Sequence, residues 1–190
     1  MSAHAPAALL AAEVFDLDGR RVPLAREWAE APVVLVLLRH FGCLFCKEQA
    51  AEMNAIGPDV AALGARMVFV GSGSAQYARW FVEDYGGDWP VRWPVYSDPD
   101  LVTYGALGAR RGWWTSVNPR SWLLSLRALR GGFRQSLQEM GDQFQQGAVC
   151  VVLPDGSMPY AYVSRVAGDH PKAAVVLARL REAIAPPQPR

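Results

Sequence analysis

The sequence predicts one α/β domain in which strands and helices alternate along the chain. Two apolar runs, residues 31–42 and 66–74, have the Val- and Leu-rich character of central strands buried on both faces. Each is followed by a segment typical of a helix, residues 46–65 and 75–86. With 190 residues, of which 51% are hydrophobic, the chain can build one compact domain.

Shorter elements are expected on either side of this centre. Residues 14–24 alternate polar and apolar side chains around an Asp18-Gly19 turn, which predicts a small hairpin. Residues 91–108 predict a short extended segment, a turn and a short helix that ends near Gly108. In the first long helical segment, Gly57-Pro58 predicts a break or kink.

The C-terminal part predicts two strands and a closing helix. Residues 147–165 indicate the strands, which flank a Pro-Asp-Gly turn. The helix is expected over residues 170–184, with Asp169 or His170 as its N-cap.

The predicted domain spans residues 13–185. We expect the Ala-rich residues 1–12 to be a flexible N-terminus and the proline-rich residues 186–190 to be a disordered tail. Residues 109–138 form an insertion rich in Arg and Trp, with a helix expected after Asn118. Six arginines and no acidic residue lie in it: Arg110, Arg111, Arg120, Arg127, Arg130 and Arg134.

Composition excludes several classes of protein. The formal net charge of +1 favours neither nucleic acid nor an acidic partner. The N-terminus lacks the basic region of a secretory signal, and no apolar window is long enough for a membrane helix, so we expect a cytoplasmic protein. Three cysteines are too few for a disulfide framework, and a close pair in a reducing compartment indicates redox chemistry or metal binding.

Cys43 and Cys46 form a Cys-x-x-Cys motif where the strand of residues 31–42 meets the following helix. Backbone N–H groups and the helix dipole favour a thiolate there, and residues three apart on a helix are close enough for a disulfide. We expect Cys43, nearer the helix start and the solvent, to be the attacking thiolate and Cys46 to resolve the mixed disulfide. Arg39 and His40 would supply positive charge and a proton acceptor.

Other interpretations of these residues stay open. A zinc site would need further ligands, for which His40, Cys150 and His170 are candidates, although no second pair has ligand spacing. Both motif cysteines, and Cys150 in its apolar strand, would alternatively pack as small hydrophobic residues. Asp169 and His170 either reach the active site or only cap the closing helix. We predict neither a metal nor a cofactor.

Several motifs together resemble a known family. They are the 14–24 hairpin, the Phe-Gly-Cys-x-x-Cys junction, the 96–108 turn and helix, the 141–156 approach to the last hairpin and the Gly-Asp-His-Pro of residues 168–171. From about residue 14 to residue 185, the chain resembles the peroxiredoxin-like 2 branch of the alkyl hydroperoxide reductase/thiol-specific antioxidant (AhpC/TSA) group.

The resemblance implies a thioredoxin-like fold: a central mixed sheet flanked by helices, an N-terminal hairpin extension and a helical Arg/Trp-rich insertion before the last hairpin. It implies an oxidoreductase that cycles Cys43 and Cys46 between dithiol and disulfide to reduce a peroxide, a disulfide or a small oxidised substrate. A thiol reductant of the thioredoxin or glutathione type would regenerate it. Typical peroxiredoxins carry Pro-x-x-x-Thr-x-x-Cys; with Cys46 on that cysteine, Cys43 replaces the Thr and Arg39 the Pro, and the two cysteines would exchange roles.

A second hypothesis is a non-enzymatic redox sensor or interaction module. The state of the dithiol would then alter the Arg/Trp-rich insertion and so a partner interface. Trp113 and Trp114, beside Arg110 and Arg111, would cover the dithiol, bind an anionic or lipid-like substrate, or dock a partner. Simple packing of the insertion on the sheet is the plainer alternative.

Overall fold

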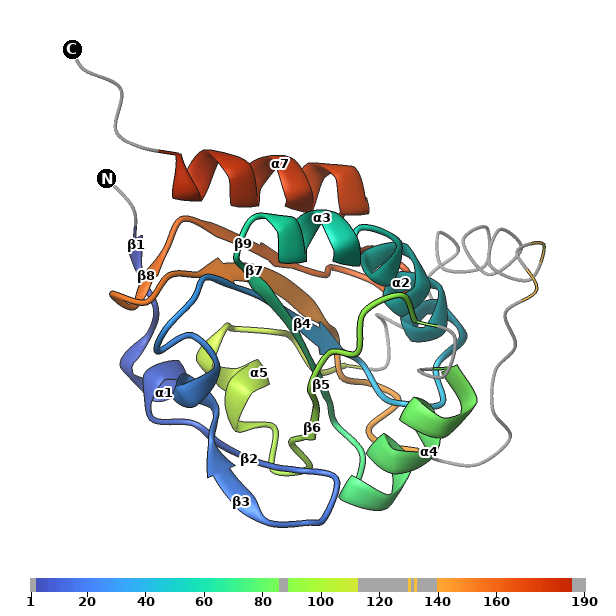
Figure 1. The fold of residues 1–190 in the computed structure, drawn as a ribbon. Coiled ribbons are helices and arrows are strands. Elements are labelled where there is room, and N and C mark those ends of the chain that lie inside the picture. The colour runs from blue at the N-terminus through green and yellow to red at the C-terminus, as the bar shows by residue number, and fades with distance from the viewer. Residues whose placement is uncertain (1–2, 86–88, 113–129, 131, 133–139, 186–190) are drawn as a thin grey trace.

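The computed structural model describes residues 3–85, 89–112, 130, 132 and 140–185. Its main sheet contains β2 (Glu13–Phe15), β3 (Arg21–Pro23), β4 (Val33–Leu38), β5 (Arg66–Gly71), β6 (Val95–Ser97), β7 (Ala148–Val152) and β9 (Tyr160–Val163). The strand order is β3-β2-β6-β5-β4-β7-β9 (Figure 1). The expected helix after Asn118 and the tail of residues 186–190 lie outside the described residues.

The sheet is mixed, as predicted. Parallel pairing joins β4 to β5 and β5 to β6, whereas β7 is antiparallel to β4 and β9 is antiparallel to β7. The expected N-terminal hairpin is the antiparallel pair β2 and β3, which extends the sheet beyond β6. All six residues of β4 are buried, because the strand lies inside the sheet with helices on both faces.

Helices cover both faces of this sheet (Figure 1). On one face, α2 (Leu44–Ala55), α3 (Gly57–Ala62), α4 (Ala75–Tyr85) and α7 (Ala173–Ile184) enclose a core that contains Val34, Val36 and Leu38. On the other face, α1 (Ala7–Leu10), the 3-10 helix η1 (Leu24–Glu27) and α5 (Val102–Ala106) enclose a core with Leu35 and Leu37. The alternation of side chains along β4 therefore supplies both cores.

The predicted break in the first long helix is confirmed. α2 ends at Ala55 and α3 begins at Gly57, with Pro58 in its first turn. Proline fits there because the first N–H groups of a helix have no partner within the helix.

The expected flexible N-terminus is wrong for residues 3–12. β1 (Ala3–His4) pairs with β8 (Ser157–Met158), and Leu9 of α1 is completely buried. The segment is ordered because its apolar side chains fill the core beside α5 and η1.

The predicted cap of the closing helix is also wrong. α7 begins at Ala173, and its N-cap is Lys172, whose side chain makes no capping hydrogen bond. Asp169 instead accepts hydrogen bonds from Tyr162 of β9 and from Arg165 in the preceding loop.

Candidate active site

The two motif cysteines lie where β4 passes into α2. Cys43 is the N-cap residue of α2, and its carbonyl oxygen accepts hydrogen bonds at 3.1 Å from the backbone N–H groups of Cys46 and Lys47. Both cysteines are thiols. Each is only 1% exposed, so the expectation that Cys43 is nearer the solvent is wrong.

Arg39 contacts both sulfur atoms. Its guanidinium Nη1 donates to Sγ of Cys43 at 3.4 Å, and its backbone N–H donates to Sγ of Cys46 at 3.2 Å. The side chain is itself buried, at 8% exposure. Because a guanidinium keeps its charge, this contact favours a thiolate at Cys43 over a neutral thiol.

The environment separates the acidities of the two thiols. A hydrogen bond from the Cys46 thiol lowers the pKa of Cys43 well below its ordinary value despite burial, and His40 and Arg39 lower it further. Burial raises the pKa of Cys46 well above its ordinary value, and its hydrogen bond to Cys43 adds to this rise. The negative charge of the pair therefore resides on Cys43 and the proton on Cys46.

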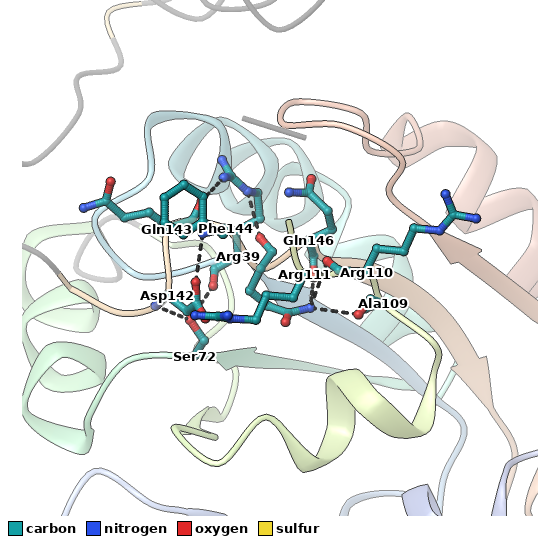
Figure 2. A network of polar contacts seen from close by, with 10 residues as sticks. Arg39, Ser72, Ala109, Arg110, Arg111, Asp142, Gln143, Phe144 and Gln146 are labelled. Carbon is teal, nitrogen blue, oxygen red and sulfur yellow. Dashed lines mark hydrogen bonds and ion pairs between the residues drawn. The ribbon is translucent and has the colours of Figure 1, made fainter. Parts of the chain in front are cut away.

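The Arg39 side chain is held in place by the segment before β7 (Figure 2). Its Nε donates to the carbonyl oxygen of Gln145 at 3.0 Å, and its Nη2 donates to the carbonyl oxygen of Gln143. Ser72 supports the same arrangement: its Oγ donates to the carbonyl oxygen of Arg39 at 2.5 Å and accepts from the N–H of Asp142 at 3.0 Å. Sequence reasoning missed Ser72, Gln143 and Gln145.

The N-terminal end of the Arg/Trp-rich insertion, residues 109–111, meets this network (Figure 2). Arg111 forms an ion pair with Asp142 and an isolated antiparallel bridge with Gln145. The N–H of Gln146 donates to the carbonyl oxygen of Arg110 at 3.0 Å. The base of the insertion is thereby joined to the segment that holds Arg39.

Two glycines allow this close approach. A Cβ atom on Gly73 would lie 2.4 Å from the carbonyl oxygen of Met140. Gly141 has a φ of +128°, and a Cβ there would lie 2.8 Å from Cβ of His40. The glycine-rich loop after β5 therefore serves as a packing surface for the 140–141 segment.

Comparison with known proteins agrees with this architecture. The family model described as AhpC/TSA antioxidant enzyme matches residues 53–166. The chain belongs to this AhpC/TSA family. It is 30% identical over 173 residues to the chloroplastic thioredoxin-like protein AAED1 of Arabidopsis thaliana, which covers 87% of this chain and 68% of that protein.

Further relatives place the AhpC/TSA chain in the peroxiredoxin-like group. It is 25% identical over 173 residues to human peroxiredoxin-like 2C, covering 86% of this chain and 75% of the relative. It is 32% identical over 145 residues to prostamide/prostaglandin F synthase of Salmo salar, covering 74% and 69% of the two chains. The chain is therefore an oxidoreductase with a peroxiredoxin-like antioxidant function.

Solved structures bear out the predicted thioredoxin-like fold. Peroxidoxin BcpB of Mycobacterium tuberculosis superposes with a TM-score of 0.67 at 19% identity, covering 98% of this chain and 99% of the other. The bacterioferritin comigratory protein of Xanthomonas campestris superposes with a TM-score of 0.65 at 20% identity, covering 95% of this chain and 97% of the other.

The comparisons leave the cellular compartment open. Among the described residues, no helix of this AhpC/TSA protein has the length and apolarity to span a bilayer. One relative is chloroplastic, and the cytoplasmic location stays a prediction.

The other predicted site residues of the AhpC/TSA enzyme lie around the two cysteines. His40 is 3% exposed and contributes to the low pKa of Cys43. Asp169 and His170 line a small cavity together with Cys46, on the side of α2 that faces the loop before α7. Burial opposes ionisation of Asp169, but hydrogen bonds from Arg165 and Tyr162 outweigh it and lower the pKa.

Cys150 lies apart from the Cys-x-x-Cys pair. It pairs with Leu35 and Ala161 in the sheet and belongs to the core of the opposite face. Burial raises the pKa of its thiol to about 12. This placement supports the core-packing interpretation. Within the described parts of the chain, no three His, Cys, Asp or Glu side chains gather as metal ligands.

Proposed function

We propose that this AhpC/TSA enzyme cycles Cys43 and Cys46 between dithiol and disulfide. One observation carries the proposal: two buried thiols share a hydrogen bond and have opposite pKa shifts, with Arg39 in contact with both sulfurs. A buried structural cysteine has a raised pKa, as Cys150 has, so the lowered pKa of Cys43 supports its assignment as the nucleophile.

The AhpC/TSA family assignment favours a hydroperoxide as the oxidant. The Cys43 thiolate would attack one peroxide oxygen, the O–O bond would break, and the second oxygen would leave as an alcohol or water after taking a proton from the solvent. Cys43 becomes a sulfenic acid. The guanidinium of Arg39, 3.4 Å from the attacking sulfur, would stabilise negative charge that develops on the departing oxygen.

Cys46 would then resolve the sulfenic acid. Its sulfur attacks Sγ of Cys43, the S–O bond breaks, and the oxygen leaves as water with the Cys46 proton. The two residues are three positions apart on the first turn of α2, so the disulfide forms with little backbone movement. Two equivalents of an external thiol would return the pair to the dithiol.

Trapping of the sulfenic acid in variants that each lack one cysteine tests the assignment of Cys43 as the attacking thiol. In Cys46→Ser, dimedone is expected to label Cys43 after one equivalent of hydrogen peroxide. Adding Cys150→Ser to this variant is the control and should leave the labelling unchanged. Dimedone on Cys46 in Cys43→Ser, at the rate seen for Cys43 in Cys46→Ser, would show that the roles are reversed. Repeated turnover with excess thiol separates the enzyme from a sensor, which reacts once.

A further inference from the structure

A small cavity reaches the redox pair at Cys46. It lies between α2 and the loop that leads to α7, and Cys43 does not line it. Its volume is about 10 Å³, which is space for one water-sized group. Only the tip of a reactant fits there in this conformation. Side chains that line it include Cys46, Gln49, Val166, Asp169 and His170.

Gln49 gives this cavity an unpaired polar wall. It lies three residues after Cys46 in α2 and therefore shares its helix face. The side chain is 95% buried, and its Nε2 has no hydrogen-bond partner among the described residues. Because a buried donor without a partner lowers stability, a ligand that brings an acceptor atom into the cavity would recover that loss.

A wider groove adjoins the cavity at His170. The groove lies between α2 and the start of α7 and has a volume of about 760 Å³, a size typical of small-molecule sites. His170 lines both spaces; its side chain is 5% exposed, and its Nε2 lies 3.5 Å from Oε2 of Glu52. Lys172, two residues after His170, is exposed and also lines the groove, so its charge and those of Glu48 and Glu52 give the walls both signs.

We propose that this groove binds a low-molecular-weight thiol of amino-acid or peptide type and that its sulfur attacks Cys46 through the cavity. This inference rests on the proposed function, since it needs the Cys43–Cys46 disulfide. Glu52 and Lys172 suit the ammonium and carboxylate groups of such a thiol. The buried thiols, reached through a space for one small group, favour this reductant over a protein thiol.

The electrons balance in two exchange steps. The external thiolate attacks Sγ of Cys46, the bond to Cys43 breaks, and the electron pair leaves on Cys43 beside the guanidinium of Arg39. A second external thiolate attacks the external sulfur of the mixed disulfide. Cys46 then leaves and takes a proton, and the two external thiols have become one disulfide.

Mapping of the mixed disulfide tests which sulfur is attacked. The purified protein is oxidised with one equivalent of hydrogen peroxide, mixed with reduced glutathione, quenched with N-ethylmaleimide and acid, and analysed by peptide mass spectrometry. We expect glutathione on Cys46 and maleimide on Cys43. Glutathione on Cys43 in a protein that does form the disulfide overturns this inference alone, whereas failure to form the disulfide overturns the proposed function as well.

Variants of the cavity and groove test the route. Val166→Phe places a larger side chain in the cavity wall and is expected to slow reduction by glutathione at least tenfold. Val175→Phe is the matched control, because Val175 is 46% exposed on α7 and does not line the cavity or the groove. Equal rates for the two variants would rule out this route.

A surface variant tests the charge preference without altering the core. Lys172→Glu should slow reduction by anionic glutathione several-fold and should slow reduction by uncharged 2-mercaptoethanol much less. The added carboxylate lies at the N-terminus of α7, where the helix dipole accommodates it. An unchanged glutathione rate, or an equal loss with both thiols, would contradict a charged thiol in the groove.

Discussion

Nη1 of Arg39 lies 3.4 Å from Sγ of Cys43, while the other nitrogens of the guanidinium donate to backbone carbonyl oxygens of Gln143 and Gln145. The carbonyl oxygens fix the plane and position of the charged group. They carry no formal charge, so these two hydrogen bonds position the guanidinium without reducing its positive charge.

Arg39→Met should raise the pKa of Cys43, because the thiolate loses the guanidinium in contact with it while burial stays the same. The thiolate fraction at neutral pH then falls, and reaction with hydrogen peroxide should slow at least about tenfold. The pH profile of iodoacetamide alkylation measures the shift. Arg39→Lys keeps the charge, so its alkylation midpoint should lie between those of wild type and Arg39→Met. A midpoint for Arg39→Met equal to that of wild type would contradict the role of Arg39 in lowering the pKa of Cys43.

The hydrogen bond from the Cys46 thiol should lower the pKa of Cys43. This hydrogen bond is the largest cause of the lowered pKa of Cys43. Cys46→Ser retains a donor and Cys46→Ala does not, so the ionisation midpoint of Cys43 should be higher in the alanine variant. Ultraviolet absorbance of the thiolate during a pH titration measures both; identical midpoints would exclude the hydrogen bond as a cause.

Cys150 should be inert in the folded protein. The Cys43 and Cys150 thiols are both buried, but burial raises the pKa of Cys150 to about 12, so it is protonated at neutral pH, whereas the lowered pKa of Cys43 favours the reactive thiolate. Maleimide in excess is expected to label Cys43 first and to label Cys150 only after unfolding in guanidinium chloride. Peptide mapping checks the order, and labelling of Cys150 at the rate of Cys43 would contradict it.

Tyr104 should stabilise the C-terminal ends of β4 and β5 near the active site. Its hydroxyl lies 2.5 Å from the carbonyl oxygen of Leu38 and 3.2 Å from that of Val70. Tyr104→Phe removes a buried donor and should lower the free energy of unfolding by about 1–3 kcal/mol in urea titrations. Tyr77→Phe is the control, because the Tyr77 hydroxyl donates no hydrogen bond among the described residues; its effect should stay within about 0.5 kcal/mol.

Leu9 should anchor the N-terminal segment. Its side chain is completely buried, so Leu9→Ala should lower the free energy of unfolding by about 2–5 kcal/mol. The neighbouring Leu10 is 37% exposed, and Leu10→Ala should have a much smaller effect. Equal losses for the two variants would mean that the segment does not pack as described.

Local patterns in the sequence were sufficient for the main elements near the site. The apolar run of β4 predicted a strand buried on both faces, and Gly57-Pro58 predicted the break between α2 and α3. The Cys-x-x-Cys spacing placed both thiols at the start of α2, and proximity in the chain brought Arg39 and His40 to them. These features depend on residues within a few positions of one another.

Long-range packing decided what the sequence did not reveal. The carbonyl oxygens that hold Arg39 come from residues 104 and 106 positions away, and backbone acceptors leave no residue-type signal. The burial of Cys43 and the order of residues 3–12 likewise depend on segments distant in the chain.

The sequence by itself thus determined the strand, the helix and the pair of thiols at their junction, because periodicity and spacing are local properties. The sequence also favoured Cys43 as the thiolate, but the burial of both sulfurs and the guanidinium position that support this assignment appear only in the tertiary structure, as does the cavity at Cys46. These quantities are set by the packing of β4, α2, α7 and the segment before β7 around the two cysteines.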